Sequence, residues 1–184
     1  MEIKATTKIY GIFGHPVSHS LSPAMHNGAF SALGLDCVYV AFDISPEEIG
    51  KAAEAVRTLG ISGINITIPH KESIIPHLDE VAPEAELTGA VNTVKNDGGR
   101  LSGHNTDVGG FLRAVEDELG IEPEGSNVFL AGAGGAARAV MSAFCMNGAS
   151  KIYILNRTHE KALRLASEFG DRFGKTKIEP IKLG

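Results

Sequence analysis

Two charged side chains in this sequence could transfer a proton during a reaction. Lys71 ends the segment Asn65-Ile66-Thr67-Ile68-Pro69-His70-Lys71, and Asp107 ends the segment Gly103-His104-Asn105-Thr106-Asp107. A lysine beside a carboxylate in a partly dry site can relay a proton to or from a hydroxyl while hydride leaves the same carbon. Plainer explanations also exist, because a lone lysine at a strand end is most often solvated. The helix dipole likewise favours an aspartate in a first turn.

Two serines near the N-terminus could bind an anion. Ser20 and Ser22 lie in the segment His19-Ser20-Leu21-Ser22-Pro23, just after the first predicted strand. A Ser-Pro pair is a typical helix start, so Ser22 could simply be an N-cap. An open helix N-terminus at the carboxyl end of a parallel strand also suits a substrate carboxylate. On the third predicted strand, alternation places Asn65 and Thr67 on one face, which indicates a site at that strand's carboxyl end.

A glycine-rich turn indicates dinucleotide binding. It lies between a predicted strand and a predicted helix and reads Gly132-Ala133-Gly134-Gly135-Ala136-Ala137. Gly132 permits a tight turn, Gly134 allows the backbone to approach a pyrophosphate, and the small Ala137 allows the helix and strand to pack closely. The N–H groups at the helix start would face the phosphates. A purely structural strand–helix turn is the alternative.

The residues after the next predicted strand favour NADP over NAD. NAD-binding folds usually place an acidic residue there to accept a hydrogen bond from the ribose 2′-OH. This chain has Asn156-Arg157-Thr158 instead, with Lys161 one helical turn further on. Arg157 could pair bidentately with a 2′-phosphate and Thr158 could donate its hydroxyl. Thr158 could equally cap its helix, and that role is compatible with phosphate binding.

The elements that must position these residues form two α/β units. Strands are predicted at 8–14, 37–42 and 63–68. A helix is predicted from the Ser45 cap to Gly60. Its apolar face would consist of Ile49, Ala52, Ala53, Val56 and Leu59. A β-hairpin is expected over 91–103, followed by a helix from the Thr106 cap to Gly120. A second βαβ series is predicted to comprise 127–132, 135–147, 151–155 and 158–169.

The fold class is therefore α/β. We expect a substrate-binding domain with a mostly parallel sheet at 1–104. A doubly wound, Rossmann-type NADP-binding domain is expected at 105–184, and it looks incomplete.

Composition excludes several classes of protein. The 184 residues carry 17 Lys and Arg against 22 Asp and Glu, a net charge of −5, which argues against nucleic-acid or anionic-lipid partners. No apolar run approaches the ~20 residues of a membrane span, and the first residues lack a signal-peptide pattern. Cys37 and Cys145 are expected to be reduced core residues in a cytoplasmic protein. The seven histidines show no metal-ligand spacing, so no metal is expected.

The ordered set of motifs resembles the shikimate dehydrogenase family. Any one block is weak evidence, whereas six blocks in the family's order are highly specific and cover most of the chain. They are His19-Ser20-Leu21-Ser22-Pro23, Asn65-Ile66-Thr67-Ile68-Pro69-His70-Lys71, Gly89-Ala90-Val91-Asn92-Thr93, Gly103-His104-Asn105-Thr106-Asp107, Gly132-Ala133-Gly134-Gly135-Ala136 and Asn156-Arg157-Thr158.

The resemblance implies reversible, NADPH-dependent reduction of 3-dehydroshikimate to shikimate, a step of chorismate and aromatic amino-acid biosynthesis. By the family's pattern the substrate carboxylate contacts Ser20 and Ser22, and the ring hydroxyls contact Thr67, Asn92 and Asp107. Lys71 would be the acid/base group. The pyrophosphate would bind the glycine turn, and the 2′-phosphate would bind Asn156, Arg157 and Thr158. The partners expected are these small molecules, and a homodimer is left open.

Two departures from the family and three alternatives accompany this expectation. The chain ends where the family continues, so a fragment with weak or absent turnover is expected. His104 also stands where relatives often carry an acidic residue. One alternative is a quinate/shikimate dehydrogenase that uses NAD or NADP. A second is a non-catalytic shikimate- or quinate-sensing relative, although retention of both Lys71 and Asp107 counts against it. A reductase in which only the second unit is functional would leave the first-unit motifs unexplained.

Overall fold

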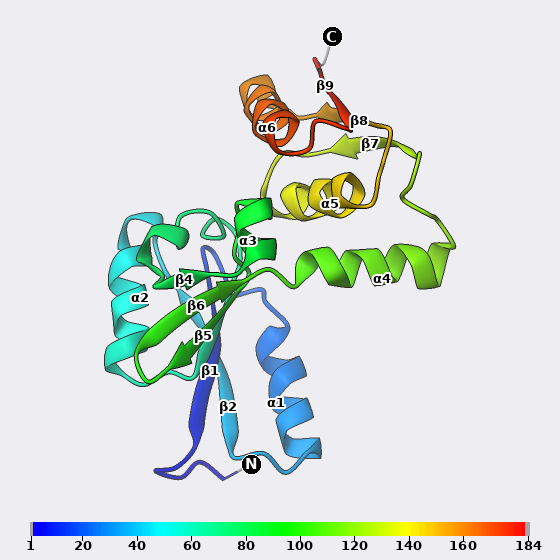
Figure 1. The fold of residues 1–184 in the computed structure, drawn as a ribbon. Helices are drawn as coiled ribbons and strands as arrows, with labels where there is room; N and C mark the ends of the chain where they lie inside the picture. Colours follow the sequence, from blue (N-terminus) through cyan, green and yellow to red (C-terminus); the bar gives the residue numbers. More distant parts are fainter. Residues whose placement is uncertain (1, 183–184) are drawn as a thin grey trace. The chain divides into compact units, whose positions relative to one another are not determined.

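The computed structural model describes residues 2–182, which form two compact α/β units (Figure 1). The first unit contains the chain up to Ala85 together with Val91–His104, and the second contains Glu86–Ala90 and the chain from Asn105 onward. Residues 86–90 were expected in the first domain, whereas their contacts group them with the second unit. Among the described residues, no helix is long and apolar enough to cross a membrane.

Two arginines explain why residues 86–90 belong to the second unit. Arg172 donates from Nη1 to the carbonyl oxygens of Glu86 and Leu87, at 2.9 and 2.8 Å. Arg138 approaches the carbonyl oxygen of Thr88 at 3.4 Å and forms a 2.7 Å ion pair with Glu168. These carbonyls lie at the end of a short helix, where the last backbone acceptors lack partners within the helix.

The first unit is built on a six-stranded mixed sheet in the order β2-β1-β3-β5-β6-β4. β1 pairs in parallel with β2 and β3, and β4 pairs in parallel with β6, whereas β5 runs antiparallel to β3 and β6. The bounds are β1 Lys8–Gly14, β2 Cys37–Asp43, β3 Gly63–Ile66, β4 Glu80–Val81, β5 Thr93–Asp97 and β6 Arg100–His104. The expected parallel βαβ start and the β5–β6 hairpin are confirmed.

Helices cover both faces of this sheet, as Figure 1 shows for α1 and α2. Neighbouring residues of β1 belong to different cores: Phe13 packs with the α2 residues Ala53 and Val56, whereas Ile12 packs with Tyr39 and, on α1, Phe30. This alternation is the period-two pattern of a strand buried on both faces. The helices are α1 Ser22–Ala32, η1 Pro46–Glu48, α2 Ile49–Thr58, η2 Ile75–His77 and α3 Pro83–Thr88.

The second unit contains a three-stranded parallel sheet in the order β7-β8-β9, with helices between the strands. Its elements are α4 Asp107–Leu119, β7 Asn127–Ala131, α5 Gly135–Met146, β8 Lys151–Leu155, α6 His159–Arg172 and β9 Lys177–Ile181. Met141, Ile152, Ile154 and Phe169 are fully buried in its main core. The predicted βαβ series is confirmed, and the structure adds β9.

Several predicted details are wrong. The helix predicted from Ser45 begins with one 3-10 turn instead of a side-chain cap, and Leu59, assigned to its apolar face, is 70% exposed. β3 ends at Ile66, two residues earlier than expected. Thr106 occupies the N-cap position of α4 without a side-chain capping bond. These differences lie at the ends of elements, where local patterns are least decisive.

Candidate active site

In the first unit, the polar residues of the predicted site lie at the carboxyl edge of the sheet. Because β1 and β3 are parallel and in register, their ends meet there. Thr67 N donates to Phe13 O at 2.9 Å, and His15 N donates to Ile68 O at 3.0 Å. A Cβ atom on Gly14 would lie 2.5 Å from the Thr67 methyl carbon. Glycine at that position therefore lets Thr67 pack directly against the end of β1.

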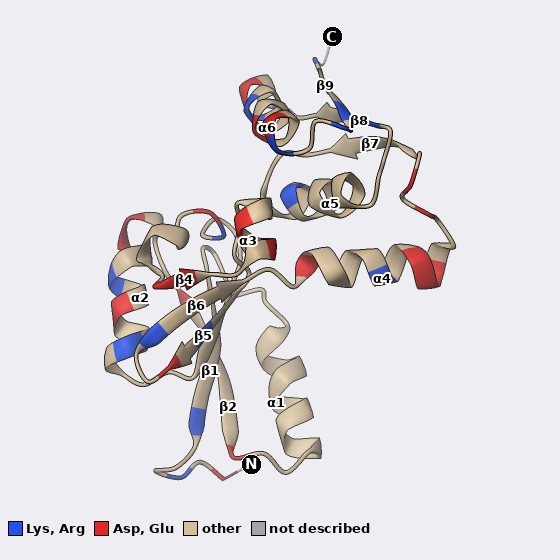
Figure 2. Ribbon diagram, in the orientation of Figure 1, with Lys and Arg blue, Asp and Glu red and all other residues tan. Residues whose placement is uncertain are grey.

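The two predicted anion-binding serines lie at the start of α1. Ser22 is the first helical residue, Leu21 occupies the N-cap position, and Ser22 N donates to Ser20 Oγ at 3.3 Å. The N-cap interpretation of Ser22 is therefore wrong. Figure 2 shows that α1 carries no charged side chain, and its first turn has no acidic residue. The helix start thus offers backbone N–H groups and hydroxyls without a carboxylate that would repel an anion.

The loop after β3, which carries Lys71, is fastened to its surroundings by backbone and side-chain bonds. The carbonyl oxygen of Lys71 accepts from Val91 N at 2.8 Å. His70 is fully buried, and its Nε2 lies 2.8 Å from Ile44 O, a bond in which the ring nitrogen donates. The sequence gives no signal for this contact, since a histidine next to a lysine suggests an exposed pair. The half-buried Lys71 side chain therefore projects from a fixed backbone.

Asn92 joins this edge from the start of β5. Its side chain is 8% exposed, and its backbone carbonyl accepts from Ile66 N at 2.8 Å. The structure therefore gathers Thr67, the Lys71 loop and Asn92 around the ends of β1, β3 and β5. Tyr39, Asn65 and Thr93 form hydrogen bonds that lead to Asn92. Sequence analysis assigned no role to Tyr39 or Thr93.

In the second unit, Asp107 is the first residue of α4, and a buried asparagine holds it there. Asn105 is 4% exposed, and its Oδ1 accepts from Asp107 N at 3.0 Å. The Asn105 amide nitrogen donates to Ala90 O at 2.8 Å and to Thr88 Oγ1 at 3.2 Å. Asn105 thus performs the capping role that sequence analysis assigned to Thr106. Lys71 belongs to the first unit, so its pairing with Asp107 stays a prediction.

The glycine turn leaves room for the pyrophosphate that the sequence predicts there. Gly132 has φ +125°, which a residue with a Cβ rarely adopts, and its N–H donates to Leu155 O at 2.8 Å. Gly134 precedes α5, and a Cβ built there would meet no atom within 4 Å. Close packing therefore does not explain Gly134, and the open space beside it would allow a ligand to approach the backbone. Ala137 is buried in the core under the turn.

Donors for a phosphate follow β8 at the same edge, because Ala131 and Leu155 are paired across the two parallel strands. Asn156 is anchored by a 2.8 Å bond to Thr158 O, and Thr158 holds the N-cap position of α6 without using its side chain as a cap. Arg157, Thr158 and Lys161 are exposed, and within residues 2–182 neither cation forms an ion pair. The arrangement suits a 2′-phosphate.

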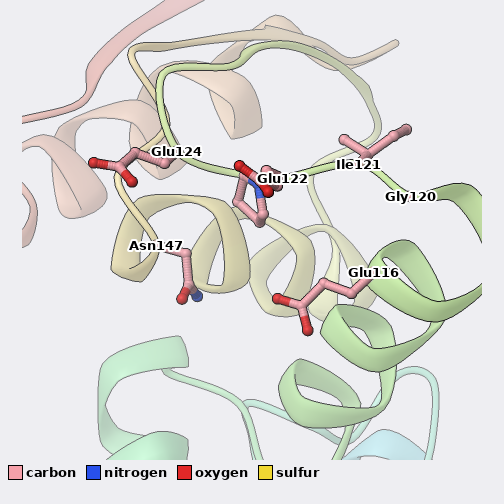
Figure 3. Close-up of a pocket in the computed structure, with 7 residues that line it drawn as sticks. Glu116, Gly120, Ile121, Glu122, Glu124 and Asn147 are labelled. Carbon is pink, nitrogen blue, oxygen red and sulfur yellow. The ribbon is translucent and has the colours of Figure 1, made fainter.

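A separate cavity of about 490 Å³ in the second unit has a different character. It is lined by the end of α4, the following loop and Asn147, as Figure 3 shows. Three of its lining residues are Glu116, Glu122 and Glu124. Carboxylates repel phosphates, and no predicted site residue lines this cavity. It is therefore distinct from the predicted nucleotide-binding edge.

The polar sheet edge of the first unit and the glycine turn of the second define an α/β protein with a Rossmann-type nucleotide-binding unit. A family model described as the shikimate dehydrogenase substrate binding domain matches residues 12–94. A second, described as shikimate / quinate 5-dehydrogenase, matches residues 114–183. The chain belongs to the shikimate dehydrogenase family.

Individual relatives agree with this membership. The chain is 47% identical over 183 residues to a shikimate dehydrogenase (NADP(+)) of Geobacter metallireducens. This alignment covers 100% of this chain and 64% of that protein. A crystal structure of a shikimate dehydrogenase with NADP+ aligns with TM-score 0.88 and 44% identity, over 97% of this chain and 63% of the other. The Thermus thermophilus enzyme with NADP(H) and shikimate aligns with TM-score 0.80 and 43% identity, over 95% and 63%. The chain thus spans less than two thirds of these relatives.

Proposed function

We propose that the protein carrying this chain reversibly reduces 3-dehydroshikimate to shikimate with NADPH. The observation that carries the proposal is the arrangement at the carboxyl edge of the first sheet. There, the backbone hydrogen bonds described above hold Thr67, the Lys71 loop and Asn92 in place. Family membership supports the substrate class, and the relatives' names support NADP. Open α/β sheets bind ligands at this edge.

The first unit binds the acid substrate. Ser20 and Ser22 bind its carboxylate, since the uncharged start of α1 supplies N–H groups and hydroxyls. Thr67 and Asn92 bind ring hydroxyls, and Asp107 contributes from the second unit. Together these contacts fix the ring so that one carbon–oxygen bond faces Lys71.

Lys71 is the acid/base group of the reaction, and Asp107 assists it. In the reductive direction the lysine ammonium donates a proton to the carbonyl oxygen that becomes a hydroxyl. In the oxidative direction the neutral amine accepts that proton. An anionic partner stabilises the ammonium form.

The second unit binds NADP, which supplies or takes up the hydride when bound. Backbone N–H groups of the turn Gly132-Ala133-Gly134-Gly135-Ala136 bind the pyrophosphate. Asn156, Arg157, Thr158 and Lys161 bind the 2′-phosphate, which an acidic residue at this edge would repel.

Steady-state assays of the complete protein that carries this chain test the proposal against its alternatives. Shikimate-dependent reduction of NADP, faster than reduction of NAD and faster than oxidation of quinate, is the expected result. Rates with quinate and NAD comparable to those with shikimate and NADP would instead support the hypothesis of a quinate/shikimate dehydrogenase. Saturable shikimate binding without reduction of either cofactor would support the hypothesis of a non-catalytic sensing protein.

A further inference from the structure

A chain of hydrogen bonds crosses the first sheet and ends on Asn92. Tyr39 Oη donates to Asn65 Oδ1 at 2.7 Å, and Asn65 Nδ2 donates to Thr93 Oγ1 at 3.3 Å. Thr93 Oγ1 donates to Asn92 Oδ1 at 2.9 Å. The residues come from β2, β3 and β5 and from the position just before β5. The chain therefore connects a buried phenol with a residue at the predicted substrate edge.

The orientation of the Asn65 amide in this chain is fixed by one backbone group. Asn65 Nδ2 also donates to the backbone carbonyl of Asn92, at 3.4 Å, and a carbonyl oxygen can only accept. The nitrogen of the Asn65 amide must therefore face β5, and its oxygen must face Tyr39. The Thr93 hydroxyl then receives a hydrogen from Asn65, and its single hydrogen is directed to Asn92. Only the oxygen of the Asn92 amide can accept it.

The surroundings preserve the donor at the start of the chain. Tyr39 is 4% exposed, its ring stacks on His26 with centroids 4.3 Å apart, and its backbone N and O both bond to the Asn27 amide at 2.9 Å. Burial raises the pKa of the Tyr39 phenol to about 12, so the hydroxyl keeps its proton through the neutral range. Since an amide oxygen is its partner, the phenol acts as a donor.

We infer that Thr93 is a positioning residue that orients the Asn92 amide with its nitrogen, not its oxygen, directed away from β5, and that Tyr39 sets this orientation through Asn65. The inference rests on the proposed function in one respect, because it assigns Asn92 the role of a hydrogen-bond donor to the substrate. A substrate must then present an acceptor lone pair to Asn92. Without the Thr93 hydroxyl, Asn92 Oδ1 loses this donor, and the amide is held less firmly in that orientation.

Three variants of the complete protein separate this role from a general structural one. Thr93→Val removes the hydroxyl at constant shape, Thr93→Ser retains it, and Tyr39→Phe removes only the first donor. Tyr39, Asn65 and Thr93 line a cavity of about 250 Å³, so none of these changes overpacks the sheet. Equal melting temperatures of variant and parent proteins are the control for folding.

The expected result is a KM for shikimate about tenfold higher in Thr93→Val, with kcat within about twofold of the parent value. Thr93→Ser should keep the parent KM. Tyr39→Phe should have an intermediate KM, because the backbone carbonyl of Asn92 still holds Asn65. The KM of a shikimate analogue that lacks the hydroxyl bound by Asn92 should be the same in Thr93→Val and in the parent. An equal loss with shikimate and this analogue would overturn the inference.

A neutron crystal structure of the parent protein gives a readout that does not depend on activity. Deuterium on Thr93 Oγ1 directed at Asn92 Oδ1 is expected, and deuterium on Asn92 Nδ2 directed at Thr93 would contradict the inference. Failure of the proposed function is distinguished from this outcome, because it would leave the parent protein without shikimate binding while the neutron result stands.

Discussion

At the residue scale, the backbone contacts of the site explain why only a few positions carry its chemistry. Thr67 is seated on Gly14, Lys71 follows a buried His70, and Asp107 follows a buried Asn105. In each case a polar side chain is preceded or faced by a buried residue. Such support is what holds reacting groups in one geometry.

Substitution of Lys71 by Ala should lower kcat about 10²- to 10⁴-fold in the complete protein, because the acid/base group is lost, and should change the KM for shikimate only modestly. Steady-state kinetics with shikimate and NADP measure both constants. Lys51→Ala is the matched control, since Lys51 lies on α2 with an 84% exposed side chain. Near-normal turnover of Lys71→Ala would remove this lysine from the mechanism.

Substitution of Arg157 by Ala should raise the KM for NADP tenfold or more, because a charge-assisted hydrogen bond to the 2′-phosphate is lost. The KM for NAD, which lacks that phosphate, should stay unchanged. Arg164→Ala removes an exposed arginine from α6, the helix that follows Arg157, and serves as the control. A parallel rise for NAD and NADP would show that Arg157 acts on something other than the 2′-phosphate.

At the element scale, Arg57 joins three parts of the first unit. From α2 it pairs with Asp79 and donates to the carbonyl oxygens of His77 and Gly99. Asp79 Oδ2 also accepts from Leu101 N at 2.7 Å. The helix α2, the segment before β4 and the β5–β6 hairpin are thus held by one ion pair and its neighbouring backbone groups.

This ion pair predicts a pH dependence of stability. The bonds from Leu101 N and Arg57 lower the pKa of Asp79 below its usual value of 3.8. A carboxylate with a lowered pKa in the folded state stabilises the fold above its unfolded-state pKa. That stabilisation is lost as pH falls through the folded-state pKa. Asp79→Asn should therefore lower the free energy of unfolding at pH 7, and the difference from the parent should shrink below about pH 4.

Urea unfolding followed at several pH values measures this difference. Asp97→Asn is the control, because the Asp97 side chain at the end of β5 is 80% exposed and forms an ion pair with another exposed residue, Lys95. A constant difference between Asp79→Asn and the parent from pH 7 to pH 3 would contradict the prediction.

At the scale of the whole molecule, each unit has its own buried core, one around Ile64 and Leu101 and another around Ile152 and Phe169. Ligands that bind different units should therefore protect different segments from hydrogen exchange. Shikimate should slow exchange in residues 20–22 and 67–71, and NADP should slow exchange in residues 132–137 and 156–161. Mass spectrometry of each complex resolves these peptides. Protection of the α4–β7 loop by NADP instead would move the nucleotide site to the acidic cavity.

Sequence alone predicts much of this molecule because its main signals are local. The β-branched runs, Gly60 and Gly120 at helix ends, and the turn at Gly132 all depend on the conformation of a few consecutive residues. What it missed depends on contacts between distant segments. Asn105 rather than Thr106 caps α4 because Ala90 and Thr88 bind its amide, and Tyr39 reaches Asn92 only through two other strands. The two-residue edge strand β4 has no sequence pattern of its own.

The five residues Glu86–Ala90 belong to the second unit although both flanking segments belong to the first. Dividing the gene after residue 104 would therefore not yield two self-sufficient pieces. The N-terminal product would carry the carbonyls of Glu86, Leu87 and Thr88 without their arginine donors. The C-terminal product would keep Arg138 and Arg172 with those acceptors removed. No single cut keeps this short stretch with its arginines and also keeps Val91–His104 with the first sheet.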